Sequence, residues 1–369
     1  MTDWDRLARP SLLGLERYDP GPTRDALKQE LGLPELEPLN WNEDLFGPPA
    51  YVLEAAAAEL RNAAYYPERA FADFRVAVAE SLGVTPSRVI PAHGAQALIG
   101  SIAAAFVDPG TPVVVPALTY GLYRQVCSAF GAAITVVPAR ELSIDLEAIA
   151  AAAHATRARL VWVCDPNNPT GELIAPDAWA AFLDRLPGDC VVVADEAYID
   201  FAEPEARAVR QDDVLAGRPV IVLRSFSKIF GLAGLRLGYA LADPHVAHLL
   251  DIVQEPFNVN RIALAAGRAA ISHPEFLPAR RAEVAEAREA LADELARAGL
   301  RSVPSQANFL LVELGVDDRP VCEALLRHGL LIRGGHEFGL PGFARVTIAR
   351  EHVMRRVARE IADAISGMR

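Results

Sequence analysis

A segment in the second half of the chain joins a short apolar run to an unusual group of polar residues. Residues 220–223 are β-branched or aliphatic, which is typical of a buried strand. Residues 225–239 then contain two serines, one lysine, three glycines and one arginine. In an open α/β sheet, ligands bind beyond the carboxyl ends of the strands. We therefore expect Lys228 to place an amine in a ligand-binding site.

Three other apolar runs also end in polar residues. A single lysine after a strand is ordinarily a solvated surface residue. Four strand ends that carry complementary polar groups favour a shared pocket instead, because ligand sites in such sheets form at the strand ends. The three runs and the polar segments that follow them are 160–164 with 165–171, 190–194 with 195–198, and 89–92 with 93–96.

The polar residues around the lysine suit a phosphate group. Ser225, Ser227 and Arg236 offer hydroxyl and guanidinium donors for phosphate oxygens. The helix predicted to begin after Gly94 would add backbone N–H groups, including that of Ala95, and the positive end of its dipole. An amine beside a phosphate site indicates that the ligand is the cofactor pyridoxal phosphate.

Strands alternate with helices through the middle of the chain, for example a strand over 134–137 and a helix over 146–155 that Asp145 caps. This alternation predicts right-handed crossovers and a mostly parallel sheet, which is an α/β fold. The C-terminal part predicts a long helix over 276–298 and then short elements, including a strand over 330–333, of a smaller α+β domain. The predicted divisions are an N-terminal arm (1–45), packed beside the small domain and a partner subunit, a large domain (46–265) and a small domain (266–369).

Composition narrows the class of protein. The net charge of −12 argues against nucleic-acid binding, which needs a concentrated basic face. The sequence has no apolar run near the length of a membrane span and predicts no metal site. Its cysteines are far apart, and three fall in apolar segments, which favours reduced, buried thiols and a cytoplasmic location. They are Cys127, Cys164, Cys190 and Cys322.

The polar segments after the strands form motifs. They read Ser-Phe-Ser-Lys at 225–228 with Gly-Leu-Ala-Gly-Leu-Arg-Leu-Gly-Tyr at 231–239, Asn-Asn-Pro-Thr-Gly at 167–171, and Ala-Asp-Glu-Ala-Tyr at 194–198. These motifs resemble those of the class I/II, fold-type I aminotransferases, which depend on pyridoxal phosphate. Within that group the chain is most similar to the histidinol-phosphate aminotransferases. The resemblance covers nearly the whole chain in the family's order.

The resemblance implies roles around the cofactor ring. Lys228 would bond covalently to the cofactor's aldehyde and later move a proton at the substrate carbon. Asp195 would hold a proton on the ring nitrogen, which keeps the ring electron-withdrawing. Tyr198 and Asn168 would hydrogen-bond to the ring's phenolic oxygen. Tyr120 would stack flat against the ring and shield it from water.

Two further cofactor contacts lie at the edge of the implied site. The backbone of Gln96 would approach the cofactor phosphate at the start of its helix. Tyr66 would reach across a homodimer to the cofactor phosphate of the neighbouring subunit. A structural aromatic in a turn is the alternative interpretation of Tyr66.

Four residues are candidates for binding the substrate. The guanidinium of Arg345 could fix an α-carboxylate through two hydrogen bonds. Histidinol phosphate has no carboxylate, so Arg345 would then bind its phosphate together with Arg333, Tyr18 and Asn168. The expected reaction passes an amino group between histidinol phosphate and 2-oxoglutarate by a ping-pong route.

Three other functions remain open at this point. Transamination of aromatic amino acids is the nearest, and Trp41 could then enlarge an apolar contact or narrow the pocket. A threonine-phosphate decarboxylase shares most of the motifs. A non-catalytic effector-binding protein would need a DNA-binding or partner module, and we find no such segment outside the two predicted domains. The presence of both Lys228 and Asp195 also argues against that function.

Overall fold

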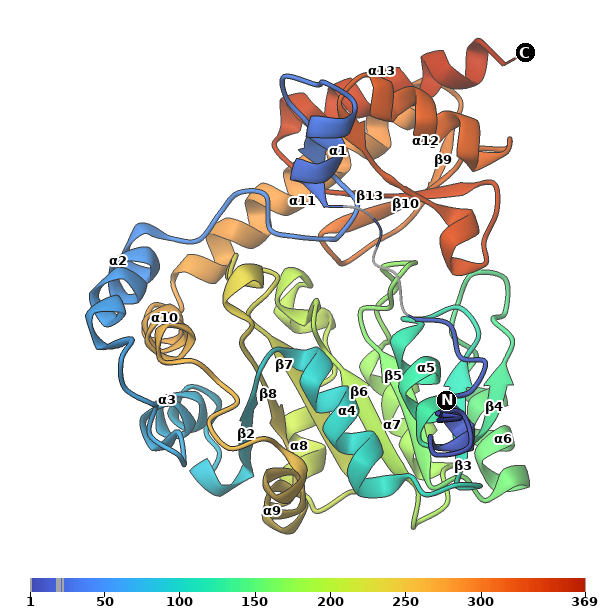
Figure 1. Cartoon of the computed structure of the whole chain (residues 1–369). Coiled ribbons are helices and arrows are strands. Elements are labelled where there is room, and N and C mark those ends of the chain that lie inside the picture. The colour runs from blue at the N-terminus through green and yellow to red at the C-terminus, as the bar shows by residue number, and fades with distance from the viewer. Residues whose placement is uncertain (1, 18–20, 22, 369) are drawn as a thin grey trace.

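The computed structural model describes residues 2–17, 21 and 23–368. They form a large domain around a seven-stranded sheet and a small domain around a four-stranded sheet (Figure 1). No helix within these ranges is both long and apolar enough to cross a membrane. The strands of the large sheet are β2 (Val89–Ala92), β3 (Pro112–Pro116), β4 (Ala133–Val137), β5 (Leu160–Cys164), β6 (Val191–Asp195), β7 (Val220–Ser225) and β8 (Gly238–Leu241).

The large sheet has the strand order β2-β8-β7-β6-β5-β3-β4. Strands β7, β6, β5, β3 and β4 pair in parallel, whereas β8 is antiparallel to both of its neighbours. The prediction of a mostly parallel α/β sheet is therefore confirmed. The helices around it are α2 (Ala50–Glu59), α3 (Ala72–Leu82), α4 (Ala95–Phe106), α5 (Leu122–Ala129), α6 (Leu146–Thr156), α7 (Pro176–Asp184), α8 (Arg210–Leu215), α9 (Pro244–Val253) and α10 (Arg261–Ile271).

The strands are continuous apolar runs because both faces of the sheet are covered. Successive side chains of a strand point to opposite faces. In β5, Val161 and Val163 accordingly join the core that includes residues of α6 and α7, whereas Trp162 joins the core that includes residues of α4 and α5. A sheet buried on two sides needs apolar residues at every position, and this is why the sequence shows runs rather than alternation.

The small domain packs three helices against an antiparallel sheet of order β12-β13-β10-β9. One predicted strand, 330–333, is divided in two: Leu330–Leu331 (β11) pairs in parallel with Glu37–Pro38 (β1), and Arg333–Gly334 (β12) pairs with β13. The division arises because two different strands meet the chain on either side of Ile332. The other elements are α11 (Phe276–Arg297), β9 (Arg301–Val303), β10 (Phe309–Glu313), α12 (Asp318–Arg327), β13 (Phe343–Thr347) and α13 (Glu351–Ser366).

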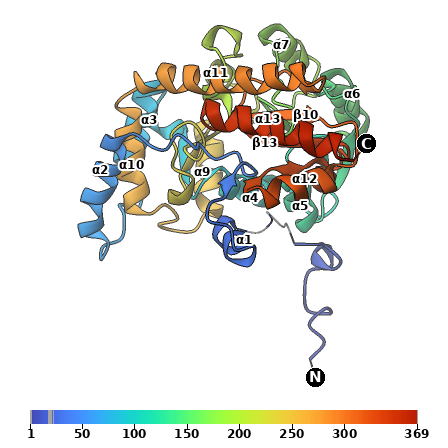
Figure 2. The ribbon, with the colours of Figure 1, turned by 90° about the horizontal axis from the view of Figure 1, so that it is seen from above.

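The two halves of the N-terminal arm contact different domains. The hydroxyl of Ser11 donates to the Ala129 carbonyl of the large domain at 2.8 Å. After α1 (Arg24–Glu30), β1 extends the small domain through β11. The first described residues, from Thr2 onward, stand clear of the body of the molecule (Figure 2). The predicted domain boundaries and the contact of the arm with a partner subunit stay predictions.

A buried cluster of charges lies at the ends of β5, β6 and β7. The side chain of Arg210 is fully buried and forms ion pairs with Asp165 and, at 2.9 Å, with Glu196. Arg224 contacts the other oxygen of Glu196 at 2.6 Å. The Arg210 guanidinium also lies 4.2 Å from the ring centre of Trp179. Each buried charge therefore depends on its neighbours for compensation.

We expect Arg210→Met to lower the free energy of unfolding by about 3–5 kcal/mol, because it leaves the carboxylates of Asp165 and Glu196 buried with less compensation. Denaturant unfolding of the apoprotein measures this loss. Arg185→Ala is the control, because the Arg185–Glu147 pair is exposed and should contribute about 0.5 kcal/mol. Equal losses in the two variants would contradict the argument.

Candidate active site

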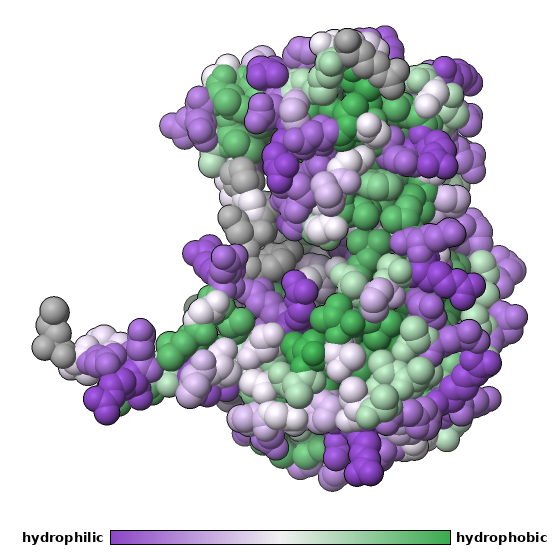
Figure 3. Space-filling model, turned by 90° about the vertical axis from the view of Figure 1, so that its right-hand side faces the viewer, coloured by the Kyte–Doolittle hydropathy of each residue, from purple (hydrophilic) through white to green (hydrophobic). Residues whose placement is uncertain are grey.

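A cavity of about 760 Å³ lies between the two domains, beyond the carboxyl ends of the parallel strands. The molecular surface is indented between the two domains (Figure 3). The large domain contributes the ends of β5, β6 and β7, and the small domain contributes Arg333 and Arg345. The pocket predicted from four polar strand ends is thus formed in the structure.

One wall of the cavity is built as a cradle for an anion. Gly94, with φ of 76°, precedes α4, and a side chain there would meet a nitrogen of Arg236 at 2.7 Å. The Ser227 N–H donates to the Ser225 hydroxyl at 3.1 Å, and Arg236 donates to the Ser227 hydroxyl at 3.3 Å. The first N–H groups of α4, beginning at Ala95, have no acceptor within their helix. The structure therefore brings together the five residues predicted to hold a phosphate.

The Gln96 side chain links the cradle to Tyr120. Its amide nitrogen donates to the Tyr120 hydroxyl at 2.6 Å, and its amide oxygen accepts from Arg236 at 3.2 Å. A neutral amide orients the guanidinium without cancelling its charge. The sequence predicted only a backbone role for Gln96, and this side-chain bridge was not expected.

The Lys228 amine lies in the same cavity and is held by two backbone carbonyls. Its nitrogen donates to the Asn42 oxygen at 2.8 Å and to the Trp41 oxygen at 3.1 Å. Burial, followed by the positive charge of Arg345, lowers the pKa of Lys228 to about 7. A substantial fraction of the amine is therefore neutral at neutral pH, as a nucleophile or a general base requires.

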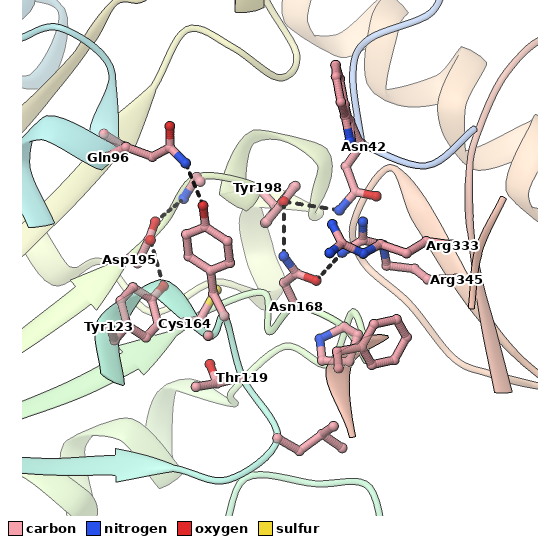
Figure 4. A pocket seen from close by; sticks show the side chains of 18 of the residues that line it. Asn42, Gln96, Thr119, Tyr123, Cys164, Asn168, Asp195, Tyr198, Arg333 and Arg345 are labelled. Atoms are coloured by element: carbon pink, nitrogen blue, oxygen red, sulfur yellow. Dashed lines mark hydrogen bonds between the residues drawn. The ribbon is translucent and has the colours of Figure 1, made fainter. Parts of the chain in front are cut away.

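Asp195 ends β6 and is almost fully buried. One carboxylate oxygen accepts from the Tyr123 hydroxyl at 2.6 Å, and the other accepts from the Ala197 N–H at 3.1 Å (Figure 4). Burial raises the pKa of Asp195, and these two hydrogen bonds oppose that effect. The carboxylate is oriented from two sides and lines the cavity.

A chain of hydrogen bonds runs from Tyr198 to the small domain. The Tyr198 hydroxyl accepts from Asn42 at 3.1 Å and from Asn168 at 3.5 Å, and the Asn168 oxygen accepts from Arg345 at 2.5 Å (Figure 4). Burial raises the pKa of Tyr198, so its hydroxyl keeps its proton. The three residues predicted at this point of the site, Tyr198, Asn168 and Arg345, are therefore in contact.

The two arginines are directly opposite each other in the β12–β13 pair. Arg345 is 5% exposed, donates to the Asn40 carbonyl at 2.6 Å and lies 5.5 Å from the ring centre of Phe309. Arg333 forms an ion pair with Glu337 at 3.3 Å. Both guanidinium groups line the cavity, as the sequence predicted.

Two predicted site residues do not line this cavity in the described structure. Tyr18 lies outside the described residues. Tyr66 is 78% exposed, and its ring stacks on Phe257 with centres 4.9 Å apart. This position agrees with a residue that acts on another subunit, but its role stays a prediction.

Two residues of the site were not assigned a role from the sequence. Tyr123 lies in the first turn of α5, three residues after Tyr120, which precedes the helix, so the spacing alone could have placed the two rings near each other. Asn42 has φ of 55°, a left-handed conformation that asparagine tolerates better than most residues. No local pattern predicts that conformation, because contacts with Lys228, Tyr198 and Thr347 impose it.

Proteins of known family are similar to this chain over nearly its whole length. The model of the family "aminotransferase class I and II" matches residues 34–361. A histidinol-phosphate aminotransferase of Brevibacillus brevis is 36% identical over 358 residues, which cover 96% of this chain and 98% of that protein. The histidinol-phosphate aminotransferase 2 of Pseudomonas aeruginosa is 37% identical over 350 residues, covering 94% and 95%. The crystal structure of histidinol-phosphate aminotransferase from Sinorhizobium meliloti, in complex with pyridoxal 5'-phosphate, has a TM-score of 0.90 at 29% identity and covers 98% of both chains.

The chain therefore belongs to the class I and II aminotransferases. The predicted fold type and enzyme class, a pyridoxal-phosphate-dependent aminotransferase, are confirmed. The roles of the individual site residues stay predictions.

The lowered pKa of Lys228 has a direct test. The sequence contains two lysines, Lys28 and Lys228, so labelled peptides are easily assigned. Brief acetylation of the apoprotein should modify Lys228 with a midpoint near pH 7, whereas an ordinary lysine reacts around pH 10. Peptide mass spectrometry from pH 6 to about 10 measures both lysines. Identical pH dependence at the two positions would refute the effect of burial and of Arg345.

Proposed function

We propose that the protein exchanges an amino group between histidinol phosphate and 2-oxoglutarate, with pyridoxal phosphate as its cofactor. The observation that carries this proposal is the cross-strand pair of Arg333 and Arg345 in the cavity that holds the Lys228 amine. Two guanidinium groups suit a phosphate-bearing donor, because each can donate two hydrogen bonds to its oxygens. The relatives named for this substrate support the same assignment.

The residues around the cavity fit the cofactor. A side chain at Gly94 would fill the space beside Arg236, so the chain leaves that space open for an anion. When bound, pyridoxal phosphate supplies a conjugated ring that withdraws electrons from the bonds at the substrate's amino-bearing carbon. Ser225, Ser227 and the first N–H groups of α4 hold the phosphate at one end of the cavity.

The remaining groups hold or move protons. The neutral amine of Lys228 accepts a proton from the substrate's amino-bearing carbon and later returns it. Asp195 keeps a proton on the ring nitrogen, and Tyr198 and Asn168 donate to the phenolic oxygen. Arg345 fixes the anionic end of the substrate, which decides which bond faces Lys228. 2-Oxoglutarate carries two carboxylates and reuses the same arginines in the second half of the reaction.

An aromatic amino acid is the second candidate donor. Trp41, Tyr120, Phe338 and Leu340 line the same cavity and give it an apolar wall. A donor with an aromatic ring could pack against that wall while its carboxylate binds Arg345.

We expect the purified protein to take up pyridoxal phosphate with the absorption band of a covalently bound cofactor, and histidinol phosphate to discharge that band faster than phenylalanine does. Borohydride reduction should then fix the cofactor mass on the peptide that contains Lys228, and Lys228→Ala should lose both signals. Arg333→Gln should raise KM for histidinol phosphate about tenfold, since one charge-assisted contact is lost, with less effect on phenylalanine.

The outcomes separate the candidates. Faster discharge by phenylalanine would replace the first proposal with the second. Release of carbon dioxide from threonine phosphate would indicate a decarboxylase. A wild-type protein that takes up no cofactor would contradict both assignments.

We also propose that the protein works as a homodimer. Helix α2 and the turns after it expose apolar side chains, and one of these, Tyr66, stacks on Phe257. Burial of such a patch against a second copy would remove apolar surface from water. The role that the resemblance implies for Tyr66, contact with the cofactor phosphate of the neighbouring subunit, requires a dimer. The exposed apolar residues are Leu53, Leu60, Tyr65, Tyr66 and Phe257.

Sedimentation velocity tests this interface. Leu60→Asp should convert a dimer into a monomer, because it places a charge in the proposed contact. Val209→Asp changes an equally exposed residue elsewhere and should leave the dimer intact. A monomeric wild type, or a dimer that Leu60→Asp does not weaken, would remove the support for this surface.

We also propose that the protein is located in the cytoplasm. Cys127, Cys164 and Cys190 are buried free thiols. Burial raises the pKa of Cys127 to about 11, which keeps this thiol protonated and unreactive at neutral pH. Buried reduced thiols suit a reducing compartment.

A further inference from the structure

Tyr123 lines the cavity beside Asp195 and is hydrogen-bonded to it. Its side chain is fully buried, and its hydroxyl donates to Asp195 at 2.6 Å. The ring stacks on Trp162, with centres 4.8 Å apart and planes 9° apart, and meets Tyr120 edge-on at 5.5 Å. Two neighbouring aromatic rings therefore fix the direction in which the hydroxyl points.

The charged and titratable groups around Asp195 come from several elements. Its carboxyl group interacts electrostatically with Tyr123 of α5, Cys164 at the end of β5 and Lys228 after β7. Two further groups, Glu196 and Tyr198, follow Asp195 in the chain.

Only some of these groups favour the ionised carboxylate. The negative charge of Glu196 opposes ionisation of Asp195, although Arg210 and Arg224 pair with it. Lys228 favours ionisation only while its amine is charged. Among the described residues, the donors hydrogen-bonded to the carboxylate are the Tyr123 hydroxyl and the Ala197 N–H.

We propose that Tyr123 is a positioning residue that keeps Asp195 ionised and aimed at the ring nitrogen of the cofactor. This inference rests on the role of Asp195 proposed above. A hydrogen bond to the charged form of an acid stabilises that form, and a buried carboxylate has few other sources of stabilisation. Burial and the adjacent Asp195 charge raise the pKa of Tyr123 well above its usual value, so its hydroxyl stays a donor at every working pH.

The matched variant is Tyr123→Phe, which keeps the stacked ring and removes only the hydroxyl. Loss of one hydrogen bond to the charged form should raise the pKa of Asp195. Below that pKa the variant binds pyridoxal phosphate about tenfold more weakly than the wild type. The difference shrinks as the pH rises, because Asp195 becomes ionised in both proteins.

Equilibrium dialysis with pyridoxal phosphate from about pH 4 to about 9 measures this dependence without any turnover. Tyr239→Phe is the control, because Tyr239 is buried in β8 near Arg224 and does not contact Asp195. A Tyr123→Phe protein with unchanged affinity would overturn the proposal. So would an affinity lowered by the same factor at every pH, which is what a purely structural role predicts.

Asp195→Asn separates this inference from the proposed function. If Asp195 binds the ring nitrogen, Asp195→Asn weakens cofactor binding, and adding Tyr123→Phe to it changes the pH dependence no further. If Asp195→Asn binds the cofactor as tightly as the wild type, the proposed role of Asp195 fails. If Asp195→Asn weakens binding but Tyr123→Phe does not, only the role of Tyr123 fails.

Discussion

The structure depends on two neighbouring acids whose side chains leave the end of β6 in opposite directions. Asp195 turns into the cavity and accepts from Tyr123, whereas Glu196 turns into the protein and pairs with Arg210 and Arg224. The two side chains separate because successive side chains of an extended chain point in opposite directions. One short segment therefore supplies both a carboxylate that faces the cavity and the anchor that fixes its backbone.

A second constraint is the passage of the arm between the two domains. Asn42 adopts a left-handed backbone conformation, and its side chain reaches Tyr198 while its carbonyl accepts from Lys228. Asp44, close behind it, forms a buried ion pair with Arg280 of α11. The arm thus completes the wall of the site, and the cavity is built from three parts of the chain that lie far apart in sequence.

The sequence carried enough information to predict the sheet and much of the site. Apolar runs identified the strands, and the rule that ligands bind beyond strand ends brought Lys228 and Asp195 together before any contact was known. Asn42 was missed because its role depends on long-range contacts rather than on local pattern. The spacing of Tyr123 from Tyr120 was a local signal, but it does not show that the Tyr123 hydroxyl reaches Asp195. The split at Ile332 was missed for the same reason, since a run of apolar residues does not show which strand each half will pair with.

The placement of the two carbonyls that hold Lys228 links its chemistry to the position of the small domain. The segment that carries them is fastened to that domain: the Leu39 carbonyl accepts from the Thr347 N–H at 2.9 Å, and the Asn42 N–H donates to the Thr347 hydroxyl at 3.0 Å. The lysine itself belongs to the large domain. A shift of one domain against the other would therefore move these oxygens relative to the amine, together with the Arg345 guanidinium that lowers the pKa of Lys228. The basicity of Lys228 therefore depends on the relative position of the two domains.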